Sequence, residues 1–278
     1  MLGAMESAQQ SPVRIDELTR HDDRLAAAAL LAGIWGVPPA ESPVPSDLMT
    51  ALTHAGGCVL GAWTPDGALV GVTIGFAGAP GSDRVYSYIA GVDASFAGRG
   101  LGRRLKLAQR DWALRRGAAI LTWTYDPLIR RNAHFNLNRL GGRVTGFVRD
   151  YYPPMLDAVN AGDLPDRFVV DWTLADEPGG RPLPAGAASG PVVLAGGAGA
   201  EPEVRHGELA VATASGAGSG GVVRAWVPSD IEGLRGGDPA LGRRWRLAAR
   251  EVFGALFGAG FRPVGIDADG HYVFVKGA

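Results

Sequence analysis

Three glycines alternate with larger residues directly before a long segment that has neither glycine nor proline. They are Gly98, Gly100 and Gly102, and the segment carries lysine or arginine at positions 103, 104, 106, 110, 115 and 116. A glycine-rich turn lets an anion approach the backbone closely. The helix start behind it offers unpaired N–H groups and the positive end of the helix dipole. The spacing therefore predicts an anion site, with a pyrophosphate as the obvious ligand.

A glycine-flanked helix start often binds nothing, so the surrounding pattern has to support this reading. A dinucleotide-binding fingerprint would need a third glycine in G-x-G-x-x-G and an acidic residue about 20 positions later. Here Arg103 and Arg104 follow Gly102, and no glycine stands at the required spacing. The dinucleotide alternative is therefore excluded.

Strand and helix patterns alternate along the chain and must position this turn. We expect helices at 21–35, 47–54, 129–140 and 239–257, and strands at 58–64, 68–76, 85–92, 118–126, 143–149, 168–174 and 222–228, with a final pair after residue 262. Pro65, Asp66 and Gly67 between two β-rich runs predict a hairpin. This order indicates an α/β (α+β) protein.

The composition limits the classes of protein that fit. Lysine and arginine number 27 and aspartate and glutamate 28, so the net charge of −1 argues against a nucleic-acid or membrane-surface binder. One cysteine excludes a disulfide framework and a cysteine-based zinc site, and we expect no metal. The longest apolar run, 26–37, is too short to span a bilayer. Residues 1–12 lack the apolar core of a signal peptide, so a cytoplasmic protein is expected.

The second half of the chain differs in composition from the first. Residues 177–221 are rich in glycine, alanine and proline, and we interpret them as a linker or loops in which 192–195 and 208–213 could form strands. They separate a domain at 13–176 from an α/β unit at 222–278. LGRRLKLAQRD (101–111) is similar to LGRRWRLAARE (241–251). This match predicts a degenerate repeat, with chance similarity of two arginine-rich helices as the alternative.

The stretch IAGVDASFAGRGLGRRL resembles the acyl-CoA-binding motif of the GNAT acyltransferase superfamily. LTWTYDPLIRRNAHFNLNRLGG partly matches the second motif of that family. The resemblance implies a mixed central sheet flanked by helices, with residues 222–278 as a C-terminal extension. It also implies acetyl-CoA or another acyl-CoA as co-substrate. The cofactor-binding residues implied are Val92, Gly98, Arg99, Gly100, Leu101, Gly102, Arg103 and Asn132.

Acyl transfer to an amine benefits from a base, because an alkylamine is mostly protonated at neutral pH. The candidates are Asp126, Tyr125 and His134, and Asp126 follows the end of the strand that should run beside 85–92. Each has a structural alternative. Asp126 could form the turn or cap the next helix, Tyr125 could pack on the sheet, and His134 could be an ordinary surface or packed histidine.

The resemblance implies an N-acyltransferase that moves an acetyl or succinyl group to a primary amine of a small molecule, by direct transfer in a ternary complex. A homodimer stays open. Two positions depart from the family pattern: Ala97 replaces the usual arginine or glutamine, and Leu137 replaces a tyrosine that protonates the leaving thiolate. One alternative is therefore an acyl-CoA-binding or regulatory protein without catalysis, and another is a protein whose second half binds a partner while the first half is a scaffold. A thiolate leaves fairly well without an acid, so Leu137 does not exclude turnover.

Overall fold

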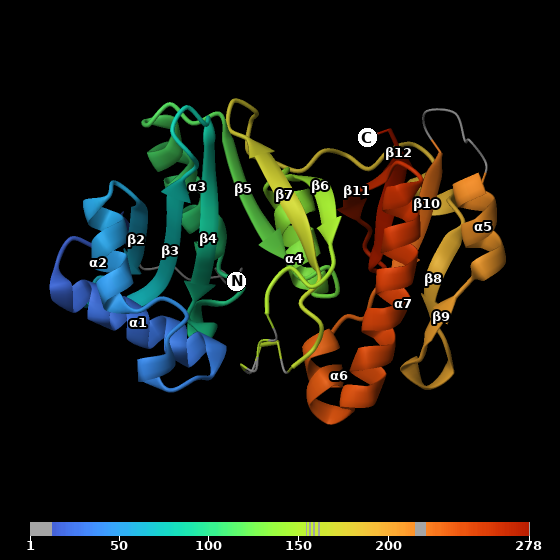
Figure 1. The fold of residues 1–278 in the computed structure, drawn as a ribbon, viewed down its shortest axis with the longest axis horizontal. Coiled ribbons are helices and arrows are strands. Elements are labelled where there is room, and N and C mark those ends of the chain that lie inside the picture. The colour runs from blue at the N-terminus through green and yellow to red at the C-terminus, as the bar shows by residue number, and fades with distance from the viewer. Residues whose placement is uncertain are drawn as a thin grey trace, which may run out of the picture. The chain divides into compact units, whose positions relative to one another are not determined.

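The chain forms two compact units, Met1–Gly117 and Ala118–Ala278, in a computed structural model (Figure 1). The structure describes residues 13–153, 155, 157, 159–160, 162–214 and 221–277. Strands and helices occur in both units, which confirms the α/β class. The expectation about residues 1–12 lies outside the described residues.

The first unit is an antiparallel sheet with two α-helices inserted after its first strand and one α-helix after its last strand. Its elements are β1 (Arg14–Glu17), α1 (His21–Trp35), η1 (Pro39–Glu41), α2 (Ser46–His54), β2 (Cys58–Trp63), β3 (Leu69–Ala77), β4 (Arg84–Val92), η2 (Ala94–Phe96) and α3 (Leu101–Leu114). Strands β1 to β4 pair in sequence order, and every pair is antiparallel. The hairpin predicted around Asp66 joins β2 to β3, with Gly67 at φ 86°.

Both faces of this sheet are covered by helices of the same unit. Helices α1 and α2 pack on the face that carries Val59, Val72 and Ile74. Helix α3 packs on the opposite face, where β3 has glycines. A Cβ on Gly71 would lie 2.9 Å from Leu105 of α3, so the missing side chain lets the helix approach closely. This packing fixes where α3 begins.

The second unit contains two sheets. Its elements are β5 (Ile120–Tyr125), α4 (Arg130–Ala133), the π-helical turn η3 (His134–Arg139), β6 (Arg143–Val148), β7 (Arg167–Thr173), η4 (Ala187–Ser189), β8 (Val192–Gly196), η5 (Ala198–Ala200), β9 (Pro202–Val204), α5 (His206–Ala214), β10 (Val222–Trp226), α6 (Ile231–Gly237), α7 (Pro239–Gly258), β11 (Phe261–Ile266) and β12 (His271–Lys276). Strands β5, β7 and β6 pair in that order, all antiparallel. The other sheet has the order β11-β12-β10-β8-β9.

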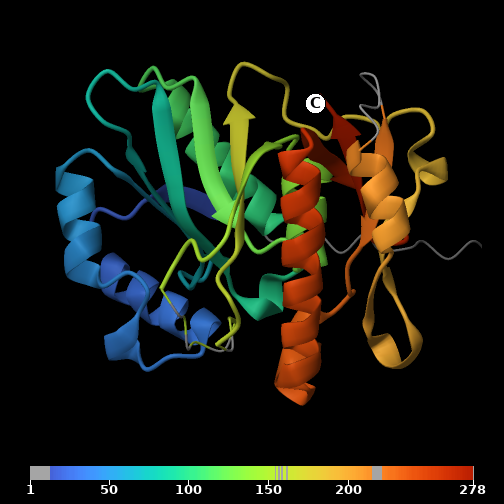
Figure 2. The ribbon, with the colours of Figure 1, turned by 45° about the vertical axis from the view of Figure 1, so that its right-hand side comes forward.

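Aromatic side chains connect these two sheets through α7. The cluster comprises Phe147, Phe168, Phe253, Phe257, Tyr272 and Phe274, with neighbouring ring centroids 5.2–6.4 Å apart. These rings come from β6, β7, α7 and β12. Figure 2 shows α7 as the long orange-red helix in front of the C-terminal strands. The C-terminal segment therefore shares one hydrophobic core with the strands β6 and β7.

Two expectations about the C-terminal half are wrong. Residues 208–213 belong to helix α5, not to a strand. Strands β8 and β10 are parallel neighbours, and parallel neighbours need a crossover connection, which α5 supplies. The predicted register of the repeat is also wrong: if α7 were the counterpart of α3, β11 would lie beside β10, whereas β12 lies between them. The similarity of 101–111 to 241–251 is that of two amphipathic helices in different connections.

The segment 177–221 contributes ordered elements to the second sheet. The strand expected at 192–195 is β8, and it pairs with β9 and β10. The predicted domain boundaries at 176 and 221 stay a prediction, and the compact units divide after Gly117. Within the described ranges no single helix has the length and apolarity to cross a membrane. One pair bent by 95°, His21–Trp35 with Pro39–His54, meets those criteria only when taken together.

Candidate functional site

The loop between β4 and α3 has the backbone conformation that its glycines predict. Strand β4 ends at Val92, and Oδ1 of Asp93 accepts a hydrogen bond from the Ser95 backbone N–H at 2.9 Å, which fixes the turn η2. Gly98 and Gly100 follow with φ of 74° and 75°. Other residues rarely adopt this left-handed region. The two glycines are therefore required by the path of the chain into α3.

Open space lies outside these glycines. A Cβ on Gly98 or Gly100 would meet no described atom within 4 Å. Gly100 is the N-cap of α3 and has no side chain to accept a hydrogen bond from the first turn. The first N–H groups of a helix have no acceptor within the helix. The start of α3 is thus an uncapped, approachable helix N-terminus, which suits an anion.

A pocket of about 910 Å³ adjoins this helix start. Its described lining is Val13, Thr64, Pro65, Asp66, Ala68, Leu69, Val70, Asp93, Ser95, Phe96, Arg99, Leu101 and Arg104. Arg99 lies over the Phe96 ring, 5.4 Å from its centroid, and Arg104 donates to the Val13 carbonyl oxygen. Both arginines are therefore oriented by neighbours at the rim where the helix begins.

The sequence-predicted cofactor residues fall into two groups. Val92 and residues 98–103 lie on one continuous stretch of the first unit, from the end of β4 to the first turn of α3. Asn132 is half-buried on α4 in the second unit. The first group is continuous in the chain, and Arg99 and Leu101 of it line the pocket; the cofactor contacts of both groups stay predictions.

Asp126 does not have the surroundings of a general base. Its side chain is 5% exposed, and its Oδ2 accepts from Nη2 of Arg246 at 2.7 Å and Nη2 of Arg235 at 2.8 Å. Burial acts to raise the pKa of Asp126, but the charges of Arg246, Arg235 and Arg167 outweigh it and hold that pKa far below its usual range. Its Oδ1 also accepts from the Leu128 backbone N–H at 2.9 Å. The structural alternative therefore fits, and we correct the role of Asp126 from base to buried ion-pair partner.

The other two catalytic candidates lie in contrasting surroundings. Tyr125 is buried, and the hydroxyl of Tyr272 lies 3.3 Å from its own. Burial raises the pKa of Tyr125, so its phenol is neutral and packs in the core as the structural alternative proposed. His134 is exposed at the start of η3. No described contact of Tyr125 or His134 assigns either side chain to substrate binding, and their catalytic roles stay predictions.

The residues that surround Asp126 could not be recognised from the sequence. Arg235 of α6 and Arg246 of α7 are 3% and 1% exposed, and both bind Oδ2 of Asp163, at 2.8 and 2.9 Å. Among the described residues, Nη1 and Nε of Arg235 and Nη1 of Arg246 have no hydrogen-bond partner. Arginines in amphipathic helices usually face solvent, so only the tertiary contacts distinguish these two.

An acidic group in the second unit is explained by a turn. Carboxylates of Asp267 and Asp269 and the ring of His271 have potential ligand atoms within 4.8 Å of one another. Oδ1 of Asp267 accepts from the backbone N–H groups of Asp269 and His271, at 3.0 and 2.9 Å. These bonds shape the β11–β12 hairpin, and we assign no metal role to the group.

No family model and no curated protein matches this sequence. Solved structures match it. They include the ribosomal-protein-S18-alanine N-acetyltransferase from Escherichia coli (TM-score 0.47, 19% identity, 62% of this chain and 99% of that chain). An acetyltransferase of the GNAT family from Streptococcus pneumoniae has a TM-score of 0.49 and 15% identity, over 58% of this chain and 99% of its own. The protein yncA from Salmonella typhimurium, solved with acetyl-CoA, has a TM-score of 0.48 and 18% identity, over 63% and 99%. Over that part, this chain is similar in fold to GNAT acetyltransferases.

Proposed function

We propose that this protein is an acyl-CoA-dependent N-acyltransferase that acylates a primary amine of a small molecule. The observation that carries the proposal is the uncapped start of α3 behind two left-handed glycines, directly after the end of β4. Its backbone N–H groups would bind the CoA pyrophosphate, and Val92 would pair with the pantetheine arm. Arg99 adds positive charge at the rim. This chemistry needs no metal. We propose that the protein is located in the cytoplasm.

The reaction is a direct transfer in a ternary complex. The neutral amine attacks the thioester carbon, the new C–N bond forms, the C–S bond breaks, and the proton lost by nitrogen ends on the solvent or on the CoA thiolate. Because a thiol has a pKa of about 8.5, the thiolate can leave without an acid at the position of Leu137. Acetyl and succinyl are the acyl groups we propose, and a homodimer is compatible with this scheme.

A second candidate function is acyl-CoA binding without turnover. Leu137 has no hydroxyl, and the carboxylate of Asp126 is held by Arg235 and Arg246. Leu137 therefore supplies no acid and Asp126 is engaged in ion pairs, which leaves His134 as the exposed base candidate. This observation favours an acyl-CoA sensor as the alternative.

The deciding experiment measures CoA binding and CoA release separately. Acetyl-CoA and succinyl-CoA binding is measured by calorimetry, and thiol release is then followed over a panel of primary amines. Binding with amine-dependent release supports the acyltransferase. Binding without release on any amine supports the sensor, and no binding contradicts both.

Two glycine variants test the site itself. Gly100→Glu places a carboxylate where the phosphate should lie, so acetyl-CoA binding should be lost. Gly117→Glu is the matched control, because Gly117 has φ 76° and open space around it at the other end of the same helix segment. The two substitutions cost similar backbone strain. If both bind acetyl-CoA equally well, the assignment of residues 98–103 is wrong.

A further inference from the structure

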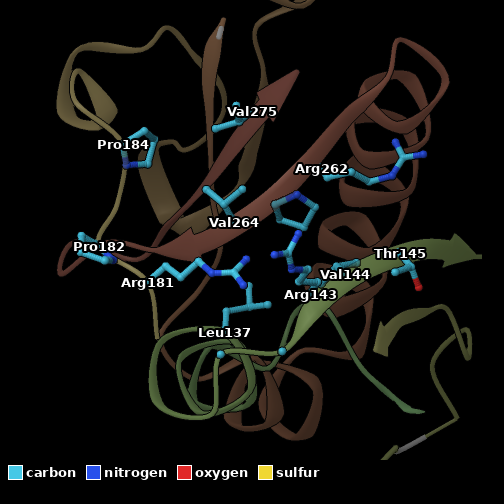
Figure 3. A pocket seen from close by; sticks show the side chains of 13 residues that line it. Leu137, Arg143, Val144, Thr145, Arg181, Pro182, Pro184, Arg262, Val264 and Val275 are labelled. Atoms are coloured by element: carbon cyan, nitrogen blue, oxygen red, sulfur yellow. The ribbon is translucent and has the colours of Figure 1, made fainter. Parts of the chain in front are cut away.

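A second pocket, of about 550 Å³, lies entirely within the second unit (Figure 3). Its described lining is Leu137, Gly141, Gly142, Arg143, Val144, Thr145, Arg181, Pro182, Pro184, Arg262, Pro263, Val264 and Val275. Its size is in the range of small-molecule sites. Most of these side chains are aliphatic, whereas the charged ones are all arginines. No aspartate or glutamate is among the described residues that line it.

The pocket exists because two sheet edges meet there without pairing. Strand β6 is the edge of one sheet and β11 the edge of the other. Each carries a register shift, so Thr145 and Val264 are skipped in the pairing with β7 and β12. Pro263 additionally removes a backbone donor from β11. Bulges at both edges keep the strands from joining into one continuous sheet, and both skipped residues line the pocket.

The strands around the pocket are held at fixed positions. Asn138 of η3 donates from Nδ2 to the Ile266 carbonyl oxygen at 2.8 Å and accepts from the Ile266 N–H at 3.0 Å. This bidentate bond ties η3, and with it Leu137, to β11. These hydrogen bonds hold the backbone segments around the pocket in place, so the pocket does not depend on side-chain packing alone.

A short segment closes one side of the pocket. A Cβ on Gly180 would overlap the carbonyl oxygen of Asn138, and one on Gly141 would overlap that of Gly179. Only glycine permits these backbone approaches. The segment 179–184 therefore packs directly on the end of η3, which places Arg181 over the pocket.

Two of the three arginines turn toward the pocket. Figure 3 shows the guanidinium groups of Arg143 and Arg181 directed toward each other near Leu137. Arg181 pairs with Asp176 at 3.0 Å, and Arg143 forms no ion pair with any described residue. Arg262 is engaged elsewhere: its Nη1 donates to the carbonyl oxygens of Phe261 and Phe257, at 2.8 and 3.2 Å. Bonds to neutral carbonyl oxygens leave the charge of Arg262 in place, so these arginines outnumber their described carboxylate partner and the mouth of the apolar pocket is positively charged.

We propose that this pocket binds a small carboxylic acid with an apolar body, its carboxylate held by Arg143 and Arg181. Guanidinium groups bind carboxylates through paired, charge-assisted hydrogen bonds. The aliphatic walls take the hydrocarbon part, and the positively charged mouth takes the carboxylate. Of the lining residues, Leu137 alone has a place in the proposed acyl transfer, and the carboxylate site of Arg143 and Arg181 does not depend on the proposed function.

Octanoate is the probe for this site. Calorimetry on the full chain should show saturable binding at one site per chain, with octanol at least about tenfold weaker. The double variant Arg143→Met, Arg181→Met should weaken octanoate binding by about tenfold or more, since the charge-assisted bonds are lost while most of the apolar stem of each side chain is kept. Arg139→Met is the matched control, because Arg139 is exposed on η3 and lies outside the lining. It should bind octanoate as the unmodified protein does.

A filling variant tests the cavity independently of charge. Val264→Trp should abolish octanoate binding and leave the urea midpoint of unfolding near that of the parent chain. Absence of octanoate binding, or equal affinity in the arginine double variant, overturns the proposal. Octyl phosphate binding tenfold more tightly than octanoate overturns the carboxylate assignment. Gly100→Glu should keep octanoate binding, which separates failure of this inference from failure of the proposed function.

Discussion

Arg246 of α7 donates from Nη2 to Oδ2 of Asp126 at 2.7 Å, although 120 positions separate the two residues in the chain. Both side chains are buried, and Arg235 binds the same oxygen at 2.8 Å. The end of β5 is therefore bound to the C-terminal helices by charge. Breaking a buried ion pair leaves an uncompensated charge, so this contact governs stability more than chemistry.

Asp126→Asn should lower the free energy of unfolding by about 3 kcal/mol, because two buried guanidinium groups lose one of the two carboxylates that they share. Urea denaturation measures this change. Asp16→Asn, which breaks an exposed pair with Arg14, is the control and should cost less than about 1 kcal/mol. Equal effects of the two substitutions would contradict the buried network.

The same contact has a pH signature. The pKa of Asp126 is lower in the folded chain than in the unfolded chain, so its stabilisation is present above about pH 4 and is lost as the pH falls toward the folded value. Unfolding free energy measured from about pH 6 down to about pH 3 should fall more steeply in the parent than in Asp126→Asn. Parallel curves would show that the carboxylate is not coupled to folding.

Lys106 should make the first unit more stable at alkaline pH. Burial lowers the pKa of Lys106 to about 7, and its Nζ donates to Ser87 Oγ at 2.6 Å. Between pH 7 and the unfolded value of 10.5 the unfolded chain binds more protons, so the unfolding free energy rises with pH by about 2 kcal/mol up to about pH 9.

Lys106→Met should remove this rise in the unfolding free energy. Urea denaturation at about pH 7 and about pH 9 measures the change. Ser87→Ala is the control, because it removes the hydrogen-bond acceptor and keeps the amine. That variant should retain the rise. A rise that persists in Lys106→Met would assign the pH dependence to another group.

Arg99→Gln should weaken acetyl-CoA binding by about fivefold, since one exposed cation at the start of α3 is lost. The loss should shrink at high ionic strength, because salt screens exposed charges. Arg115→Gln, at the other end of α3, should change the affinity by less than twofold. Calorimetry in low and high salt gives both numbers, and identical behaviour of the two variants would argue against an anion at this helix start.

Asn138→Ala should destabilise the second unit by about 2 kcal/mol, because it removes both hydrogen bonds to the backbone of Ile266. Asn138→Asp keeps the acceptor and loses the donor, so it should fall between the parent and the alanine variant. We expect octanoate affinity to follow the same order. Full octanoate affinity in Asn138→Ala would show that η3 and β11 need no tie to keep the second pocket.

The sequence alone determined the local elements and the loop before α3. Glycine spacing, helix-forming residues and the end of β4 are near neighbours in the chain, so their conformation follows from local rules: Gly98 and Gly100 are left-handed as their type predicts. The hairpin around Asp66 and helix α7 could also be predicted from the sequence. The sequence of α5 does not distinguish a helix from a strand, because alternating small apolar residues fit both. The helix is required by the parallel pairing of β8 with β10, which needs a crossover connection.

Only the tertiary structure decided what Asp126 does. A carboxylate at a strand end can act as a base, a cap or an ion-pair partner, and its pKa depends on charges brought near it in space. Arg235 and Arg246 reach it from helices more than 100 positions away. The pocket of Arg143 and Arg181 likewise arises where two sheet edges meet, a relationship between distant segments that no local pattern encodes.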